Sequence, residues 1–213
     1  VRVVVLAGRG KHFSAGADLN WMKRASAFGE AENLADARRF ARMLRALSDM
    51  SKPTIARVQG AALGGGTGLA AACDMAVAAS DAVFSTSEVK FGIIPSVISP
   101  YVLRAVGPRH ALRFFQSAER VSAERALAIG LVGEVVAVEA LDAAVAALAD
   151  TLIAGAPQAQ KAAKDLIAAV TGRPIDDAVS EETAQRIARQ RATDEAKDGI
   201  AAFLEKRQPA WLL

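Results

Sequence analysis

The chain has 213 residues, which is enough for one sizeable domain with a full hydrophobic core. Apolar residues make up 52% of it and aromatic residues only 5%, so surfaces on which nucleic-acid bases could stack are scarce. The net charge of +3, from 26 basic and 23 acidic residues, is small and spread along the chain, and we expect no nucleic-acid partner.

Cys73 is the only cysteine, so an intrachain disulfide is excluded, as is typical of proteins from a reducing compartment. No apolar run reaches the ~20 residues that a membrane-spanning helix needs. Residues 1–6 lack the charged lead and the small-residue cleavage site of a signal peptide. We therefore expect a cytoplasmic protein with no membrane partner.

The first predicted strand is Val3–Leu6, a β-branched run that we expect to be buried on both faces. A chain that opens on such a strand suggests that another segment precedes it. A loop rich in Gly and Ala follows at Gly8–Leu19. Glu30–Asp49 shows helical apolar spacing, and Lys52-Pro53 ends that helical region before a second strand, Thr54–Val58.

A second glycine loop, Ala61–Gly68, leads into a short helix of small residues, Leu69–Cys73. Two further strands are predicted at Met75–Ala79 and Ala82–Ser85. Beyond Pro95 the sequence is almost wholly helical.

Two proline-containing breaks, at Gly107-Pro108 and at residues 155–157, separate the later helices, and Ser122 is placed to cap a helix over Glu124–Ile129. The last predicted helix, Ala192–Lys206, is amphipathic. Strands that alternate with helices, followed by helices alone, indicate an α/β core with a helical C-terminal region.

The two glycine loops are the strongest candidates for a binding site. Each follows a strand and leads into a helix, where backbone N–H groups lack intrahelical partners and the helix dipole adds positive charge. Ser14–Leu19 and Ala62–Gly68 could together form an oxyanion hole, although either one alone could be a simple tight turn. Neither loop matches a phosphate loop or a dinucleotide-binding fingerprint.

These loops and several later blocks, in the same order and spacing, resemble the enoyl-CoA hydratase/isomerase (crotonase) superfamily. The resemblance covers nearly the whole chain. The blocks are Phe13–Leu19, Ile55–Gly66, Cys73–Ala78, Phe84–Glu88, Phe91–Pro95, Ala126–Val132 and Gly199–Lys206.

The resemblance implies a spiral core of ββα turns over residues 1–150 and a C-terminal helical trimerisation region over residues 151–213. It implies an acyl-CoA thioester as substrate, with coenzyme A as part of the substrate, so that neither a separate cofactor nor a metal is expected. It also implies a homotrimer or a hexamer. Relatives carry a strand-and-helix segment before the position of Val1.

The resemblance also assigns roles to individual residues. The backbone N–H groups of Ala17 and Gly65 would be the oxyanion-hole donors, and Glu88 the acid/base. The remaining residues that would bind the substrate or its CoA are Ala15, Asp18, Leu19, Gly64, Phe203 and Lys206. Of these, Ala15 would lie beside the adenine, whereas Phe203 and Lys206 would reach the CoA of a neighbouring subunit.

One position departs from the usual hydratase pattern, in which a second glutamate stands where this chain has Gly68. We expect a hydratase that uses Glu88 alone. Because one base can move a proton between two carbons, a Δ3,Δ2-enoyl-CoA isomerase is the alternative, and a catalytically silent CoA-binding protein is a third reading.

The departure at Gly68, together with a second segment, indicates a subgroup within the superfamily. Gly64–Leu69 and Ile94–Val102 resemble the bacterial methylglutaconyl-CoA hydratases of leucine breakdown, and residues 96–100 replace the glycine-rich segment that usually follows Pro95.

Other polar or aromatic residues have simpler interpretations. Asp18 is predicted to cap the helix after the first loop, and Cys73 to lie in the core. His12 and His110 are predicted to be structural or exposed. Trp21 and Met22 could line an acyl pocket or pack in the core. The Arg38–Arg45 group is interpreted as a solvated helix face, although it could also reach the phosphates of CoA.

Overall fold

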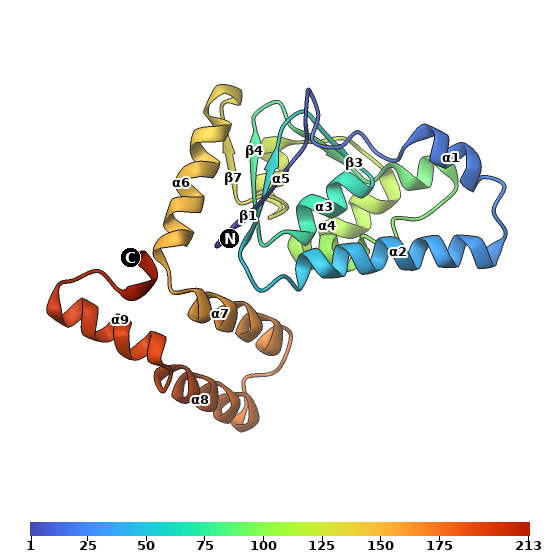
Figure 1. Ribbon diagram of the computed structural model, residues 1–213. Helices are drawn as coiled ribbons and strands as arrows, with labels where there is room; N and C mark the ends of the chain where they lie inside the picture. The colour runs from blue at the N-terminus through green and yellow to red at the C-terminus, as the bar shows by residue number, and fades with distance from the viewer. The chain divides into compact units, whose positions relative to one another are not determined.

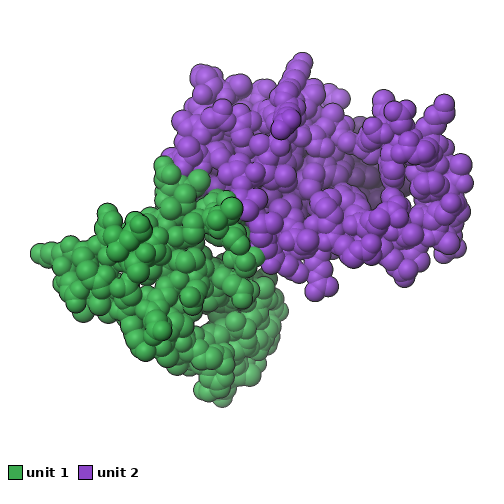
Figure 2. Space-filling view, viewed as in Figure 1, with its two compact units in different colours: residues 1–3, 51–53, 149–213 green, residues 4–50, 54–148 purple.

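The computed structural model describes residues 1–213. The chain forms two compact units, coloured separately in Figure 2. Unit 1 comprises residues 1–3, 51–53 and 149–213, and unit 2 comprises residues 4–50 and 54–148. The division into domains at residues 1–150 and 151–213 stays a prediction.

The larger sheet of unit 2 has four parallel strands in the order β1-β2-β4-β7. They are β1 (Val4–Ala7), β2 (Thr54–Val58), β4 (Met75–Ala79) and β7 (Glu134–Val136). The two central strands are almost entirely buried, as in parallel sheets covered on both faces. At the edge, β1 alternates between half-buried and exposed residues, so the expectation that it is buried on both faces was wrong.

A short polar network fixes the start of β2 against the start of β4. The Thr54 hydroxyl and its backbone N–H both donate to the Asp74 carboxylate, at 3.0 and 2.9 Å, and Asp74 N–H donates to the Thr54 hydroxyl at 2.8 Å. Since Thr54 is fully buried, these bonds satisfy polar groups that would otherwise destabilise the fold.

The smaller sheet of unit 2 carries the elements that lead to the glycine loops. Its strands are β3 (Ala61–Leu63), β5 (Val83–Ser85) and β6 (Val121–Ser122), with β3 parallel and β6 antiparallel to β5. Residues 61–63 were expected to be loop, and this expectation was wrong. Strands of two or three residues leave too little alternation for a sequence pattern to reveal them.

Five α-helices lie wholly within unit 2, which also contains the first residues of a sixth, α6 (Leu141–Ala154). They are α1 (Leu19–Ala25), α2 (Glu30–Ser48), α3 (Gly65–Ala72), α4 (Ser99–Ser117) and α5 (Ala123–Ala128), with short 3-10 helices η1 (Ser87–Phe91) and η2 (Val138–Ala140). Helix α3 packs against both α2 and α4 (Figure 1). Its Gly and Ala residues permit this close approach, and six of its eight residues are buried. It begins four residues earlier than predicted.

Several predicted boundaries are confirmed. Helix α2 begins at Glu30 as expected, and the predicted break at Gly107-Pro108 is a kink inside α4, where Gly107 has φ +71°. The Ser122 hydroxyl caps α5 by accepting the N–H of Arg125. The core of unit 2 contains Phe84 and Phe114, both almost inaccessible to solvent.

Unit 1 is helical. It contains the last residues of α6 (Leu141–Ala154), then α7 (Pro157–Val170), α8 (Asp177–Arg191), α9 (Asp194–Glu205) and the 3-10 helix η3 (Ala210–Leu212). The Arg2 guanidinium donates to the carbonyls of Ile153, Gly155 and Trp211, which ties both ends of the chain together. The Trp211 indole N–H donates to the Ala154 carbonyl at 3.1 Å, and its ring lies against Gly199 of α9.

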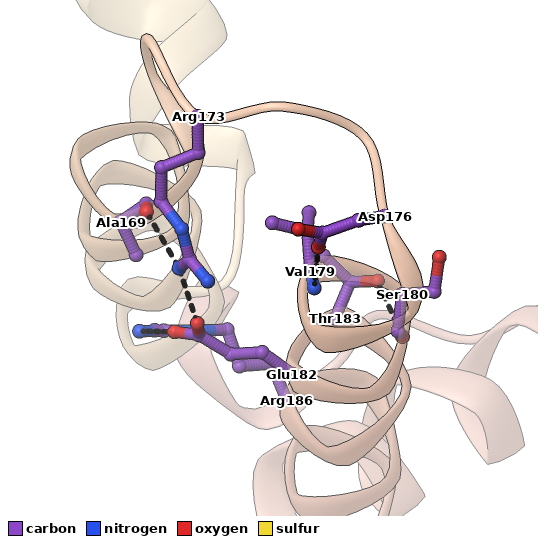
Figure 3. Close-up of polar contacts among 8 residues, drawn as sticks. All are labelled: Ala169, Arg173, Asp176, Val179, Ser180, Glu182, Thr183 and Arg186. Atoms are coloured by element: carbon purple, nitrogen blue, oxygen red, sulfur yellow. Dashed lines mark hydrogen bonds and ion pairs between the residues drawn. The ribbon is translucent and has the colours of Figure 1, made fainter.

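Polar contacts join α7 to α8 (Figure 3). Arg173, just after α7, donates to the Ala169 carbonyl and to the Glu182 carboxylate of α8, and Glu182 also accepts from Arg186. Asp176 caps α8 by accepting the Val179 N–H at 2.9 Å. No helix in either unit combines the length and apolar character needed to cross a bilayer.

Candidate active site

The start of α3 presents backbone donors. Gly64 precedes the helix with φ +53° and ψ −117°, a conformation that strongly favours glycine. The Gly68 N–H makes the first intrahelical bond, to the Gly64 carbonyl at 3.2 Å. The N–H of Gly65 therefore has no acceptor within its own helix and lies at the positive end of the helix dipole.

The first glycine loop lies directly against this helix start. Ser14 pairs with β3, since its N–H donates to the Ala61 carbonyl at 3.0 Å and its carbonyl accepts the Leu63 N–H at 2.9 Å. A Cβ atom on Gly66 would lie only 2.7 Å from the Ser14 carbonyl oxygen. The two loops that the sequence analysis singled out are therefore brought together.

Side chains from unit 2 hold the first loop in place. The Gln59 amide donates to the carbonyls of Gly8 and Gly10 at 2.9 and 3.1 Å. The His12 Nδ1 accepts the Ala61 N–H at 3.0 Å. His12 is exposed and has this structural role, in agreement with its interpretation from the sequence.

The residues at the far end of the first loop are open to solvent. Ala15, Ala17, Asp18 and Leu19 are all exposed. Asp18 caps α1 by accepting the Trp21 N–H at 2.7 Å, as predicted. That the N–H groups of Ala17 and Gly65 converge on one point stays a prediction.

Glu88 lies beside the second loop. It sits on η1, which follows β5, and the Gly64 N–H donates to the carbonyl of Ser85 at the end of that strand at 2.7 Å. Its Oε1 atom is 3.1 Å from the position that a Cβ atom would occupy on Gly64. The predicted acid/base therefore lies against Gly64, the residue that directly precedes the predicted donor Gly65.

The surroundings of Glu88 alter its acidity. Burial raises the pKa of its carboxyl above the usual range, and a hydrogen bond from its own backbone N–H lowers the pKa in part. Its Oε2 atom is buried and has no hydrogen-bond partner. A carboxyl with a raised pKa and an unpaired oxygen is suited to accept and release a proton.

At position 68, which departs from the hydratase pattern, the space for a side chain is filled by Ile98. A Cβ atom on Gly68 would lie 2.1 Å from Cγ2 and 2.6 Å from Cβ of Ile98. Ile98 is only 2% exposed. The usual second glutamate is therefore both absent and sterically excluded. Residues 96–100, which include Ile98, were noted as a departure from the family pattern, but the sequence did not reveal the contact with Gly68, because the two residues are thirty positions apart.

Apolar residues lie next to Gly65 and follow Glu88 in the chain. The ring of Phe40 on α2 faces Gly65, with Cζ 3.2 Å from the place of a Cβ atom there. Phe91, Ile93 and Ile94, which follow Glu88, are exposed. The surface of unit 2 is hollowed on one side in the space-filling view (Figure 2). Trp21 and Met22 are half-buried, which leaves both of their interpretations open.

The arginines of α2 are exposed to solvent, in agreement with a solvated helix face, and contact with CoA phosphates stays a prediction. Arg38, Arg39, Arg42 and Arg45 are exposed. Arg39 pairs with Asp36 at 2.6 Å and Arg45 with Asp49 at 3.0 Å. Exposed pairs of this kind contribute little to stability.

Two predicted substrate-binding residues belong to unit 1. Phe203 of α9 is 83% exposed, and Lys206 ends that helix with φ +56°. Glu88, Gly64 and Gly65 belong to unit 2. A role for Phe203 and Lys206 towards a neighbouring subunit's CoA stays a prediction. Two surface hollows of unit 1 contain none of the predicted site residues.

Comparisons with known proteins agree on one family. A sequence profile described as enoyl-CoA hydratase/isomerase matches residues 1–212. A crotonyl-CoA hydratase from Syntrophomonas wolfei is 38% identical over 210 residues, which cover 98% of this chain and 79% of that protein. A short-chain-enoyl-CoA hydratase from Clostridium acetobutylicum is 36% identical and covers the same shares, 98% and 79%. The crystal structure of an enoyl-CoA hydratase from Shewanella pealeana is 43% identical with a TM-score of 0.95, covering 99% of this chain and 78% of that one.

Proposed function

The chain belongs to the enoyl-CoA hydratase/isomerase family, and from this premise we propose that it is an enoyl-CoA hydratase acting on a 2-enoyl-CoA thioester. The resemblance stated from the sequence and the predicted α/β crotonase-like fold with a helical C-terminal region are confirmed. The observation that carries the proposal is the position of the Glu88 carboxylate beside Gly64, next to the unpaired N–H of Gly65.

In the proposed reaction, negative charge develops on the thioester oxygen as water adds to the double bond. The N–H groups of Gly65 and Ala17 would donate to this oxygen, which stabilises the enolate-like transition state. Glu88 would take a proton from the water molecule while the water oxygen bonds to Cβ of the substrate. Glu88 would then deliver a proton to Cα of the substrate. One carboxyl therefore serves as base and then as acid, and it ends the cycle in its starting form.

The competing isomerase is favoured by one specific observation. Gly68 stands where hydratases usually carry a second glutamate, and Ile98 fills the space in which its side chain would begin, whereas two carboxylates usually hold the water in hydratases. Isomerisation requires only the transfer of a proton between two carbons, so a single base suffices.

A substrate panel separates these activities. The purified protein would be incubated with methylglutaconyl-CoA, crotonyl-CoA and 3-hexenoyl-CoA in water enriched in oxygen-18. Hydration predicts products that carry the heavy oxygen, detected by mass spectrometry. Products with a shifted double bond and no label would instead establish the isomerase.

The proposed physiological substrate is methylglutaconyl-CoA, an intermediate of leucine breakdown. Its support is the likeness of Gly64–Leu69 and Ile94–Val102 to that subgroup. The absence of a second carboxylate also removes a like charge that would repel the carboxylate of this acyl chain. We expect methylglutaconyl-CoA to give the highest kcat/KM of the panel, and faster turnover of crotonyl-CoA would contradict the assignment.

The pH dependence follows from the environment of Glu88. As a base Glu88 must be ionised, and burial raises its pKa above the ordinary value of 4.5. We therefore expect kcat/KM to fall as the pH drops through this raised pKa, with the midpoint of the acid limb above 4.5. A profile of kcat/KM between pH 4 and 9 measures it, and a flat profile down to pH 4.5 would contradict the role of Glu88.

The proposed assembly is a homotrimer or a hexamer. Its support is the number of large apolar side chains of unit 1 that are exposed in the single chain, since burial of apolar side chains drives association. They include Ile175, Ile187, Ile200, Phe203 and Leu204. Sedimentation equilibrium would measure the mass, and a monomer at micromolar concentration would contradict the assembly.

A further inference from the structure

We propose that Gly68 and Ile98 form a steric pair in which only one position can carry a side chain, and that Ile98 thereby restricts this site to a single carboxylate. The activity part of this inference rests on the proposed hydratase function, whereas the steric part does not. Ile98 is thus a specificity-determining residue that acts by excluding a second acid.

The distances at Gly68 exclude a side chain without movement of Ile98. An added Cβ atom would lie 2.1 Å from Ile98 Cγ2, and real Cβ atoms do not approach other heavy atoms this closely. The distance to Ile98 Cβ is 2.6 Å, so shortening Ile98 to alanine gives only partial relief. Only glycine at position 98 clears the space fully.

Ile98 has little freedom to move away. It is 2% exposed and belongs to the hydrophobic core of unit 2. It is also the N-cap of α4, and its carbonyl accepts the N–H groups of Tyr101 and Val102 at 3.1 and 3.2 Å. A shift of Ile98 would therefore disturb both the core packing and the first turn of a 19-residue helix.

Position 68 lies near Glu88 along α3. The Gly68 N–H donates to the Gly64 carbonyl at 3.2 Å, so the two glycines lie one helical turn, about 5.4 Å, apart. The Glu88 Oε1 atom lies 3.1 Å from the Cβ position of Gly64. A glutamate side chain can span one helical turn, so with position 98 cleared a glutamate at 68 would bring a second carboxylate near Glu88.

The steric claim is tested by thermal unfolding of single and double variants. We expect Gly68→Ala to lower Tm in the wild-type background, to lower it less in an Ile98→Ala background, and least in an Ile98→Gly background. Gly133→Ala is the matched control, because a Cβ there would meet nothing closer than 3.7 Å. Its effect should be the same in all three backgrounds. Equal effects of Gly68→Ala in all backgrounds would overturn the steric pair.

The functional claim is tested by placing the second acid. Gly68→Glu alone is expected to reduce folding yield and activity. Two double variants that share Ile98→Gly are compared, one with Gly68→Glu and one with Gly68→Gln. The glutamine side chain has a similar volume but no charge. We expect the glutamate variant to hydrate crotonyl-CoA at least about tenfold faster, a lower limit for a general acid/base. The glutamate variant should also show a second ionisation in its pH profile, because two neighbouring carboxyls titrate as a coupled pair.

The outcomes of the two experiments are separable. Full activity of Gly68→Glu with Ile98 intact, or equal rates for the glutamate and glutamine double variants, would overturn the restriction by Ile98. If no variant and no wild-type protein hydrates any acyl-CoA, the proposed function fails, and the unfolding series still decides the steric pair.

Discussion

Glu88→Gln is expected to lower kcat of acyl-CoA hydration by roughly 10²- to 10⁴-fold, the usual contribution of a general acid/base. Glutamine keeps the size of the side chain but cannot take a proton from water. Steady-state kinetics on the best substrate of the panel measures the effect. KM should change far less than kcat, because the carboxylate acts on the reacting proton and not on the CoA moiety.

The stability of this variant provides an internal check. Burial raises the pKa of Glu88, so its ionised form is less favourable in the folded chain than in the unfolded chain. At low pH the carboxyl is protonated and its burial costs little. As the pH rises through the raised pKa, the buried carboxyl must ionise, and the free energy of unfolding falls. Glu88→Gln should therefore be at least as stable as the wild type at pH 7, with the advantage vanishing in acid.

Two results would contradict the assignment of Glu88. Retained turnover in Glu88→Gln would show that another group moves the proton. Binding of acyl-CoA without turnover in the wild type would favour the catalytically silent reading. Glu139→Gln, an exposed glutamate on η2, is the matched control for loss of a carboxylate.

Gly65→Pro is expected to lower kcat by roughly 10²- to 10³-fold, which corresponds to about 2.7–4 kcal/mol of transition-state stabilisation. The substitution deletes the N–H that we assign to the oxyanion hole. Proline is tolerated at the first position of a helix, and Gly65 begins α3 without a positive φ. Loss of the donor should thus exceed any effect on folding.

Gly65→Ala is the matched control, because it adds a Cβ atom and retains the N–H. That atom would lie 3.2 Å from Phe40 Cζ, the far end of a side chain that can rotate slightly. We expect this variant to keep most of its kcat and a Tm similar to that of the proline variant. Equal kcat values for alanine and proline would show that the Gly65 amide does not contribute to catalysis.

The helices and central strands could be predicted because their signals are local. The 3.6-residue spacing over residues 30–48 and the β-branched composition of Thr54–Val58 arise from the side chains themselves. The short strand β3 could not be predicted in this way. Its residues Ala61–Leu63 are strand because Ser14 and β5 pair with them on either side.

The candidate site could likewise be predicted only where its residues carry local motifs. The glycine loops and Glu88 carry motifs, and the structure brings them together. The contact between Gly68 and Ile98 has no local signal, since it depends on how the segment after Glu88 returns to α3. From the sequence these are two separate departures, glycine at 68 and residues 96–100 in place of a glycine-rich segment.

The placement of the two tryptophans has a practical consequence. Trp21 lies on α1 in unit 2, and Trp211 packs on Gly199 in unit 1. Each unit therefore carries its own intrinsic fluorophore. Replacing either indole with phenylalanine would leave an emission spectrum that reports on one unit alone, so that denaturant titrations could resolve whether both units melt in a single transition.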